Sequence, residues 1–213
     1  MDTVGSALRF YAITPDGKEL DELLTMVEGA LKGGITLLQL REKNREMAEE
    51  ILNDGRLQRL CNSYSVPLII NDFWDLAKEY GADGVHIGQE DGDASSIRGK
   101  LGDKIILGIT ANSVERAIRA QEAGADYIGC GAVFPTGTKS GAELISTGVL
   151  KDICESVNIP AVAIGGIDEE NMLSLKGTGI SGVSLVSAVF GTEDIHNTCL
   201  KLNDLTLELL RKV

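Results

Sequence analysis

The sequence predicts an α/β protein folded as a single (β/α)8 TIM barrel over residues 1–213. Three observations lead to this prediction. Short apolar runs alternate along the chain with helical patterns, and each run is continuously apolar, which is typical of strands covered on both faces. Strict alternation of strands and helices implies a parallel sheet with right-handed crossovers. Eight repeats in a chain this short favour a closed barrel over an open sheet.

The predicted strands are aliphatic runs at 10–14, 36–41, 67–72, 84–88, 105–110, 127–134, 161–167 and 182–189. Helical patterns fill the gaps at 20–32, 47–63, 73–80, 112–123, 149–157 and 169–175, with a weaker helix at 93–101 and a terminal helix within 192–212. Gly81 and Gly124 end two of these helices, because glycine tolerates the left-handed conformation that stops a helix. The first strand is followed by no Gly-x-Gly-x-x-Gly, which counts against a dinucleotide-binding fold.

Charge and composition count against two classes of partner. The chain has 32 acidic and 20 basic residues and a formal net charge of −12, which disfavours nucleic acid and anionic membranes as partners. An apolar run of about 18 residues, as a membrane span requires, is not found, and residues 1–9 do not read as a signal peptide. A cytoplasmic location is therefore expected, with the four scattered cysteines as reduced thiols. The oligomeric state is left open, with a homo-oligomer compatible with the sequence.

A basic cluster lies at the end of the second predicted strand, where barrels of this type carry their chemistry. Gln39, Arg41 and Lys43 alternate, so they point the same way while the chain stays extended. A guanidinium grips phosphate oxygens through two hydrogen bonds and a lysine adds a mobile charge, which predicts a phosphate site. The alternative is an ordinary solvated loop at 41–45.

Two acidic residues at neighbouring strand ends, Asp72 and Asp91, are candidate Mg2+ ligands. Mg2+ typically takes one or two carboxylates together with phosphate oxygens and water. Because Asp72 directly precedes a predicted helix, helix N-capping is the competing interpretation for this residue.

Three later loops complete the predicted mouth of the barrel. The loop at 136–139 offers hydroxyls, backbone N–H groups and a lysine around a glycine, although such a loop can also be a simple turn. Gly166 and Ser187 lie near the carboxyl ends of the seventh and eighth predicted strands, where barrels often bind phosphate through backbone N–H groups. The two histidines, His86 and His196, have no second histidine at ligand spacing and are predicted to be structural.

Taken together, the ordered segments resemble the thiamine phosphate synthase family over nearly the whole chain. The matching motifs are Gln-Leu-Arg-Glu-Lys at 39–43, Asn-Asp at 71–72, Gly-Val-His-Ile-Gly-Gln-Glu-Asp at 84–91, Val-Phe-Pro-Thr-Gly-Thr-Lys at 133–139, Ile-Gly-Gly-Ile at 164–167 and Val-Ser-Leu-Val-Ser-Ala at 183–188.

The resemblance implies a role for each matching residue. Contacts to the pyrimidine pyrophosphate are implied for Gln39, Arg41, Lys43, Asn71, Thr110 and Lys139, and Mg2+ ligation for Asp72 and Asp91. The implied thiazole phosphate site comprises Thr136, Thr138, Gly166, Val186 and Ser187, and the substrate-binding set also takes in Leu40, Glu42 and Gly137. The residues expected to act in catalysis are Arg41, Lys43, Thr110 and Lys139. Many relatives have serine at position 110, and threonine retains the hydroxyl.

The implied activity is a transferase reaction that joins the two substrates into thiamine phosphate with release of pyrophosphate. In this family the pyrimidine pyrophosphate ionises to a carbocation, which the thiazole nitrogen captures, so the protein neutralises a charged leaving group. Three alternatives remain: a thiazole tautomerase on the same barrel, an unrelated phosphate-binding barrel isomerase, and a noncatalytic sensor of phosphorylated thiamine precursors.

Overall fold

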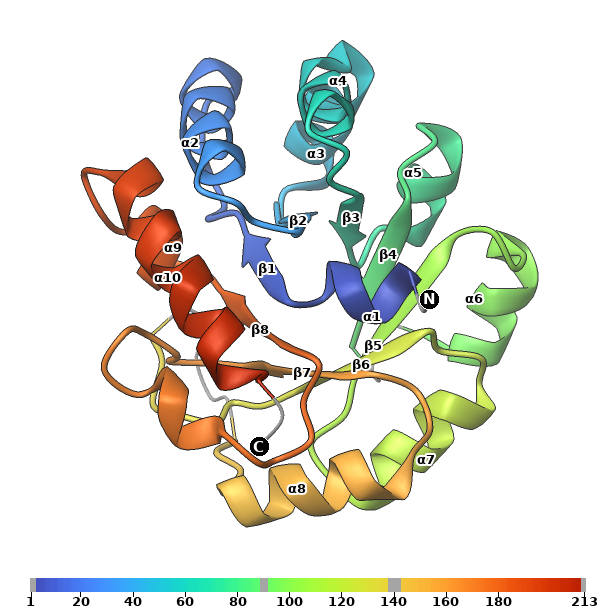
Figure 1. Cartoon of the computed structure of the whole chain (residues 1–213). Coiled ribbons are helices and arrows are strands. Elements are labelled where there is room, and N and C mark those ends of the chain that lie inside the picture. Colours follow the sequence, from blue (N-terminus) through green and yellow to red (C-terminus); the bar gives the residue numbers. More distant parts are fainter. Residues whose placement is uncertain (1–2, 89–91, 138–142, 212–213) are drawn as a thin grey trace.

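The computed structural model describes residues 3–88, 92–137 and 143–211, and within these ranges the strands form a closed parallel barrel. The strands pair in sequence order and β8 closes the barrel against β1. Figure 1 shows the helices arranged around the strands. The predicted (β/α)8 barrel is confirmed. The strands are β1 (Phe10–Ile13), β2 (Leu37–Leu40), β3 (Leu68–Asn71), β4 (Gly84–Ile87), β5 (Ile106–Thr110), β6 (Tyr127–Cys130), β7 (Ala161–Ile164) and β8 (Gly182–Leu185).

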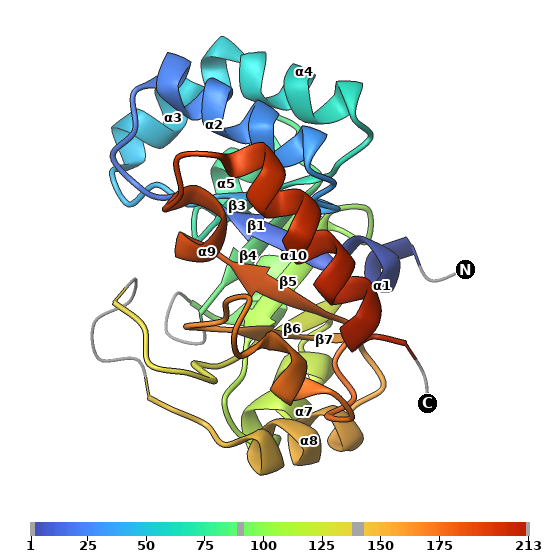
Figure 2. The ribbon, with the colours of Figure 1, turned by 60° about the vertical axis from the view of Figure 1, so that its left-hand side comes forward.

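The helical elements that cover the barrel are α1 (Thr3–Ala7), α2 (Leu20–Lys32), α3 (Arg45–Asp54), α4 (Arg56–Ser63), α5 (Trp74–Glu79), α6 (Ala94–Leu101), α7 (Val114–Glu122), α8 (Thr147–Ser156), the 3-10 helix η1 (Met172–Leu175), α9 (Ser187–Phe190) and α10 (Ile195–Leu209). Helix α1 was not predicted. Its residues Val4 and Ala7 pack against the interior of the barrel, and Figure 2 places it at the end of the molecule where both termini lie.

Alternate residues of each strand enter two separate core layers. In β1, Phe10 and Ala12 pack outward against the helices, whereas Tyr11 and Ile13 belong to the cluster inside the barrel. The interior cluster consists of Leu8, Tyr11, Ile13, Leu37, Ile69, Tyr127 and Val162. Both faces of every strand are thus withdrawn from water, which explains why the sequence shows continuous apolar runs.

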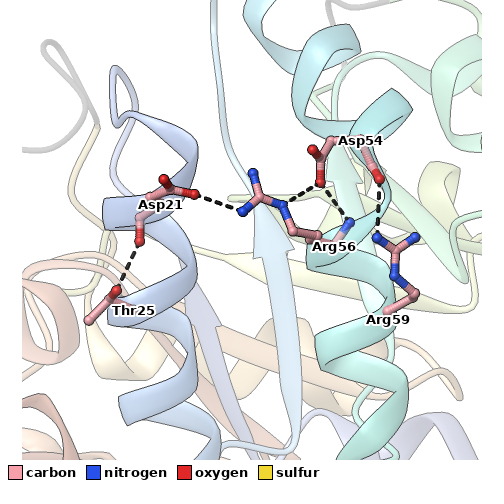
Figure 3. A network of polar contacts seen from close by, with 5 residues as sticks. All are labelled: Asp21, Thr25, Asp54, Arg56 and Arg59. Atoms are coloured by element: carbon pink, nitrogen blue, oxygen red, sulfur yellow. Dashed lines mark hydrogen bonds and ion pairs between the residues drawn. The ribbon is translucent and has the colours of Figure 1, made fainter.

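The helix predicted over 47–63 is two helices, which is a correction to the sequence analysis. Gly55 has φ 75° and separates α3 from α4. The side chain of Asp54 accepts from the backbone N–H of Arg56 (3.1 Å), so it satisfies a donor at the start of the second helix. Arg56 also pairs with Asp21 of α2 at 2.8 Å, which joins neighbouring helices in an exposed network of modest energetic value (Figure 3).

Three predicted strands end three or more residues earlier than expected. The strand predicted over 182–189 stops at Leu185 and continues as helix α9, while the runs at 127–134 and 161–167 stop at Cys130 and Ile164. The apolar residues beyond these ends, such as Ile167 and Val189, remain buried in the outer core. The predicted strands were too long because apolar character indicates burial, and it does not distinguish a strand from a packed loop or helix.

Among the residues that the structure describes, no helix is both long and apolar enough to cross a membrane. All four cysteines are free thiols, as predicted. In Figure 2, helix α9 and the segment that follows β6 lie at one end of the barrel, away from the end that holds α1 and both termini. The end that holds α9 and the segment after β6 is the mouth of the barrel, where the strands have their carboxyl ends (Figure 2).

Candidate active site

The loops that follow β1 and β2 hold Arg41 at the mouth. Its backbone N–H donates to the hydroxyl of the buried Thr14 (3.0 Å), which directly follows β1. Its guanidinium forms an ion pair with Asp16 at 3.0 Å, and only 12% of the arginine side chain is exposed. The fork is therefore oriented by protein contacts, which suits it to bidentate binding of a phosphate.

The residues around Arg41 face different environments. Lys43 is exposed beyond the strand end, as a mobile phosphate-binding cation would be. The side chain of Leu40 lies in the outer core between strands and helices. Glu42 is only 5% exposed, and its carboxylate accepts from the backbone N–H groups of Gly17 and Asn44.

Asn71 and Asp72 end β3 beside β4. The Asn71 side-chain amide donates to the Asp72 carboxylate at 2.6 Å, and the Asp72 backbone N–H donates to the His86 carbonyl at 2.9 Å. Asp72 has φ 62°, a left-handed conformation that aspartate tolerates better than most residues. The N-cap position of α5 belongs to Phe73, which makes no side-chain cap bond. The Asp72 carboxylate is thus an oxygen donor at a strand end, with the chemistry that Mg2+ prefers.

A chain of hydrogen bonds crosses the barrel interior and links two predicted substrate contacts, Gln39 and Thr110. Gln39 Nε2 donates to the Tyr11 hydroxyl (2.6 Å), which lies 2.9 Å from the Tyr127 hydroxyl. The Tyr127 hydroxyl lies 3.0 Å from His86 Nδ1, and His86 Nε2 lies 3.0 Å from the Thr110 hydroxyl. The chain joins five strands and satisfies polar groups that would be costly to bury alone.

The direction of this chain follows from the number of protons each member carries. Because Tyr11 accepts from Gln39, its single hydroxyl hydrogen is available for Tyr127, which can then donate to His86 Nδ1. If Tyr127 donates in this way, the histidine proton lies on Nε2, directed at Thr110. Burial raises the pKa of Tyr11 and of Tyr127 above the ordinary value for tyrosine, which keeps both hydroxyls protonated so that they can donate hydrogen bonds.

Glycines on neighbouring strands make room for these large side chains. A Cβ atom on Gly108 of β5 would lie 2.1 Å from Tyr127 Cζ, and one on Gly129 of β6 would lie 3.0 Å from His86 Cε1. The absence of side chains at these two positions lets Tyr127 and His86 occupy the centre of the barrel.

The loops after β6 and β7 are bound to each other at the mouth. The backbone N–H groups of Val133 and Phe134 donate to the carbonyls of Ile164 and Gly165, each at 3.0 Å. Gly166 has φ 65°, and a Cβ atom there would lie 2.3 Å from the Pro135 carbonyl oxygen. This contact requires glycine and brings Gly166 close to the loop that carries Thr136 and Gly137.

The last predicted phosphate contacts, Val186 and Ser187, follow β8. Val186 packs against the barrel interior, and Ser187 begins α9 and is exposed. Three predicted residues, Asp91, Thr138 and Lys139, lie outside the described residues. Within the described ranges, no group of three or more His, Cys, Asp or Glu side chains is placed to hold a metal ion.

Comparisons with known proteins agree with one another. The family model for thiamine monophosphate synthase matches residues 10–189. The chain belongs to this family. It is 46% identical to the thiamine-phosphate synthase of Clostridium tetani over 188 residues, covering 87% of this chain and 88% of that protein. It is 48% identical to the thiamine-phosphate synthase of Ruminiclostridium cellulolyticum over 176 residues, covering 83% and 84%.

A solved structure of similar shape supports the same assignment. The thiamine phosphate pyrophosphorylase from Pyrococcus furiosus matches with a TM-score of 0.86 and 35% identity, covering 98% of this chain and 100% of that one. The chain is therefore an enzyme of the thiamine monophosphate synthase family, a transferase, and the resemblance predicted from its motifs is confirmed.

Sequence reasoning for this family member missed the polar interior. Tyr11 and Tyr127 were not singled out, and His86 was predicted to be structural. His196 lies exposed on α10, away from this chain of hydrogen bonds. A usable signal was present: glycines at inward-facing positions of β5 and β6 indicate that large side chains from neighbouring strands fill the space.

Proposed function

We propose that the chain condenses 4-amino-2-methyl-5-hydroxymethylpyrimidine pyrophosphate with 4-methyl-5-(2-hydroxyethyl)thiazole phosphate to give thiamine phosphate and pyrophosphate. One observation carries the proposal: in a member of the thiamine monophosphate synthase family, the motif residues on β2, β3 and β5 and in the loops after β6, β7 and β8 converge on one mouth. The names of the relatives support thiamine phosphate as the product.

The pyrophosphate end of the first substrate would be bound by Arg41, Lys43 and Asn71, together with Lys139. Breaking the bond to the pyrimidine methylene carbon leaves negative charge on the departing pyrophosphate. Cations placed in advance stabilise that charge as it develops, so the reaction needs no protein nucleophile and no strong base. The thiazole nitrogen then captures the pyrimidine carbocation.

The divalent ion fits the chemistry of the acidic residues. Asp72 and Asp91 would hold Mg2+, which supplies further positive charge to the pyrophosphate when it is bound. Asn71 orients the Asp72 carboxylate through their 2.6 Å hydrogen bond, which supports this role.

The second substrate would be bound by its phosphate in the loops after β6, β7 and β8. The residues proposed for this site are Thr136, Gly137, Thr138, Gly166, Val186 and Ser187. The close packing at Gly166 supports the proposal, because backbone without a side chain lets a phosphate approach its N–H groups. Gln39 and Thr110 would contact the pyrimidine substrate from the barrel interior, held by the chain of hydrogen bonds between them.

We also propose that the single domain over 1–213 carries the whole reaction and acts in the cytoplasm. Four free thiols and phosphorylated small-molecule substrates are consistent with that compartment.

A product assay tests the function directly. The purified chain is mixed with both substrates, with and without Mg2+ and with EDTA. Thiamine phosphate should form only when both substrates and Mg2+ are present. A thiazole tautomerase would give no thiamine phosphate and would not depend on Mg2+, whereas a sensor would bind the phosphorylated compounds without product. Either result would overturn the proposal.

A single-turnover experiment tests the electrostatic mechanism at Lys139. If its ammonium stabilises the leaving group, Lys139→Ala should lower the rate of pyrophosphate release at saturating substrates by on the order of 100-fold. Lys139→Arg should recover only part of the rate, because a planar fork does not reproduce a compact point charge. A Lys139→Ala rate within about threefold of wild type would show that Lys139 has no electrostatic role in pyrophosphate release.

A further inference from the structure

The carboxylate of Glu42 joins the loops that follow β1 and β2. Its Oε2 atom accepts from the backbone N–H of Gly17 at 2.7 Å, and its Oε1 atom accepts from the backbone N–H of Asn44 at 2.8 Å. The residue is only 5% exposed. One carboxylate oxygen thus serves each loop, in the charge-assisted geometry that makes such bonds strong.

The loop segment that Glu42 holds is the one that orients Arg41. Thr14 binds the Arg41 backbone through its hydroxyl, and Asp16 pairs with the guanidinium at 3.0 Å. Gly17 directly follows Asp16 and has φ 70°, a conformation that residues with side chains rarely adopt. The bond from Glu42 to Gly17 therefore stabilises the turn that places the Asp16 carboxylate beside Arg41.

The second oxygen of the Glu42 carboxylate, Oε1, binds the backbone just beyond Lys43. Asn44 follows Lys43 directly, and its side chain caps α3 by accepting from the N–H groups of Glu46 and Met47. The bond to Asn44 ties the end of β2 to the start of α3. Lys43 therefore lies between two residues, Glu42 and Asn44, that are both held by hydrogen bonds. A buried carboxylate satisfied in this way is unsuited to contact a pyrophosphate directly, because like charges repel.

We propose that Glu42 is a positioning residue for the pyrophosphate site, which acts by holding Arg41 and Lys43 in their binding geometry. The inference rests on the proposed function, because it takes these two cations as pyrophosphate ligands. It assigns Glu42 a role through its neighbours, in place of the direct substrate contact expected from the motif.

The main test is Glu42→Gln, measured by steady-state kinetics with each substrate varied in turn. Glutamine keeps the shape, but its amide nitrogen meets one of the two backbone donors, so one of the two bonds is lost. KM for the pyrimidine pyrophosphate should rise by on the order of tenfold, while kcat and KM for the thiazole phosphate stay within about twofold.

A matched control neutralises another carboxylate that accepts from a backbone N–H, at the other end of the barrel. Asp126 Oδ2 accepts from the Leu107 backbone N–H at 2.8 Å and pairs with Arg98, where β5 and β6 begin. Asp126→Asn should lower the unfolding temperature without changing either KM. If both variants change the kinetics alike, Glu42 has only a general structural role and the inference is wrong.

A milder pair of variants keeps the test decisive should Glu42→Gln fold poorly. Gly17→Ala leaves Glu42 intact but strains the turn, and the new Cβ atom meets nothing within 4 Å. Gly81→Ala is its control, with the same φ of 70° and equally open space before β4. Only Gly17→Ala should raise KM for the pyrimidine pyrophosphate, and an unchanged KM would count against the inference.

A double-mutant cycle separates failure of the inference from failure of the proposed function. If Arg41→Ala leaves KM for the pyrimidine pyrophosphate unchanged, the proposed pyrophosphate site is wrong. If Arg41→Ala raises that KM and Glu42→Gln does not, only the Glu42 inference fails. If Glu42 acts through Arg41, adding Glu42→Gln to Arg41→Ala should have much less effect than it has alone, and fully additive effects would contradict this.

Discussion

Asp72 combines an unusual backbone conformation with a proposed ionic role. Its φ of 62° lies in the left-handed region, where a side chain other than that of Asn or Asp crowds the backbone. Its carboxylate receives the Asn71 amide, and its backbone N–H is bound by the His86 carbonyl of the next strand. Substitutions at this position therefore mix two effects, backbone strain and loss of charge, unless the variant is chosen to separate them.

Asp72→Asn should abolish activity at Mg2+ concentrations that saturate the wild type, while the unfolding temperature changes little. Asparagine tolerates the same backbone conformation but lacks the negative charge with which a carboxylate binds Mg2+ strongly. Asp72→Ala should lose activity too, and should also lose about 1 kcal/mol of stability from backbone strain. Activity assays over a Mg2+ titration, with thermal denaturation, check both variants. Near-wild-type activity of Asp72→Asn would remove the metal role.

In strands β5 and β6, glycine is found where a large side chain from another strand packs against the backbone. Gly108 lies under the ring of Tyr127, and Gly129 lies beside the ring of His86. Glycine within a strand normally weakens it, because it is flexible and offers no side chain to pack. Here the loss is offset by the packing of a tyrosine and a histidine that complete the hydrogen-bonded interior.

Gly108→Ala should destabilise the protein by about 2 kcal/mol, because the added methyl overlaps the Tyr127 ring and forces repacking of the interior. The control is Gly99→Ala in helix α6, where a Cβ atom meets nothing within 4 Å. That change should stabilise by about 0.5 kcal/mol, since alanine is the better helix former. Urea denaturation of both variants measures the difference, and equal effects would contradict the steric explanation.

On the scale of the whole molecule, the closed barrel and its ring of helices remove most thiols from water. Cys61, Cys130 and Cys199 are fully buried in α4, β6 and α10, and Cys154 of α8 is half-buried. Burial raises the pKa of Cys61 and Cys199 to about 12 and that of Cys154 to about 11. The folded protein therefore keeps these protons at a pH where the unfolded chain, with a thiol pKa of 9.0, loses them.

The free energy of unfolding should consequently fall as the pH rises from about 9 toward 11. A raised pKa in the folded state stabilises the protein below the unfolded pKa, and this contribution is lost as the pH rises toward the folded pKa. Urea denaturation at several alkaline pH values measures the slope. Cys61→Ala should lower stability at neutral pH through lost packing but make the alkaline slope shallower. A slope identical to wild type would show that Cys61 does not contribute to it.

The local sequence determined the alternation of strands and helices, the barrel class and the motif residues at the strand ends. These features depend on periodicity, turn chemistry and short motifs, which are carried by neighbouring residues. The proposed roles of Asp91 and Lys139 also come from the motifs, and remain predictions.

Only the tertiary structure decided which side chains meet. Closure of the barrel brings Tyr11 of β1 against Tyr127 of β6 and connects Gln39 to Thr110 through His86, although no local pattern relates these positions. It also directed the Glu42 carboxylate to backbone N–H groups of two loops, and ended β8 before Ser187. The physical reason is that side-chain direction and strand length depend on the packing of distant segments, which apolar character along the chain does not encode.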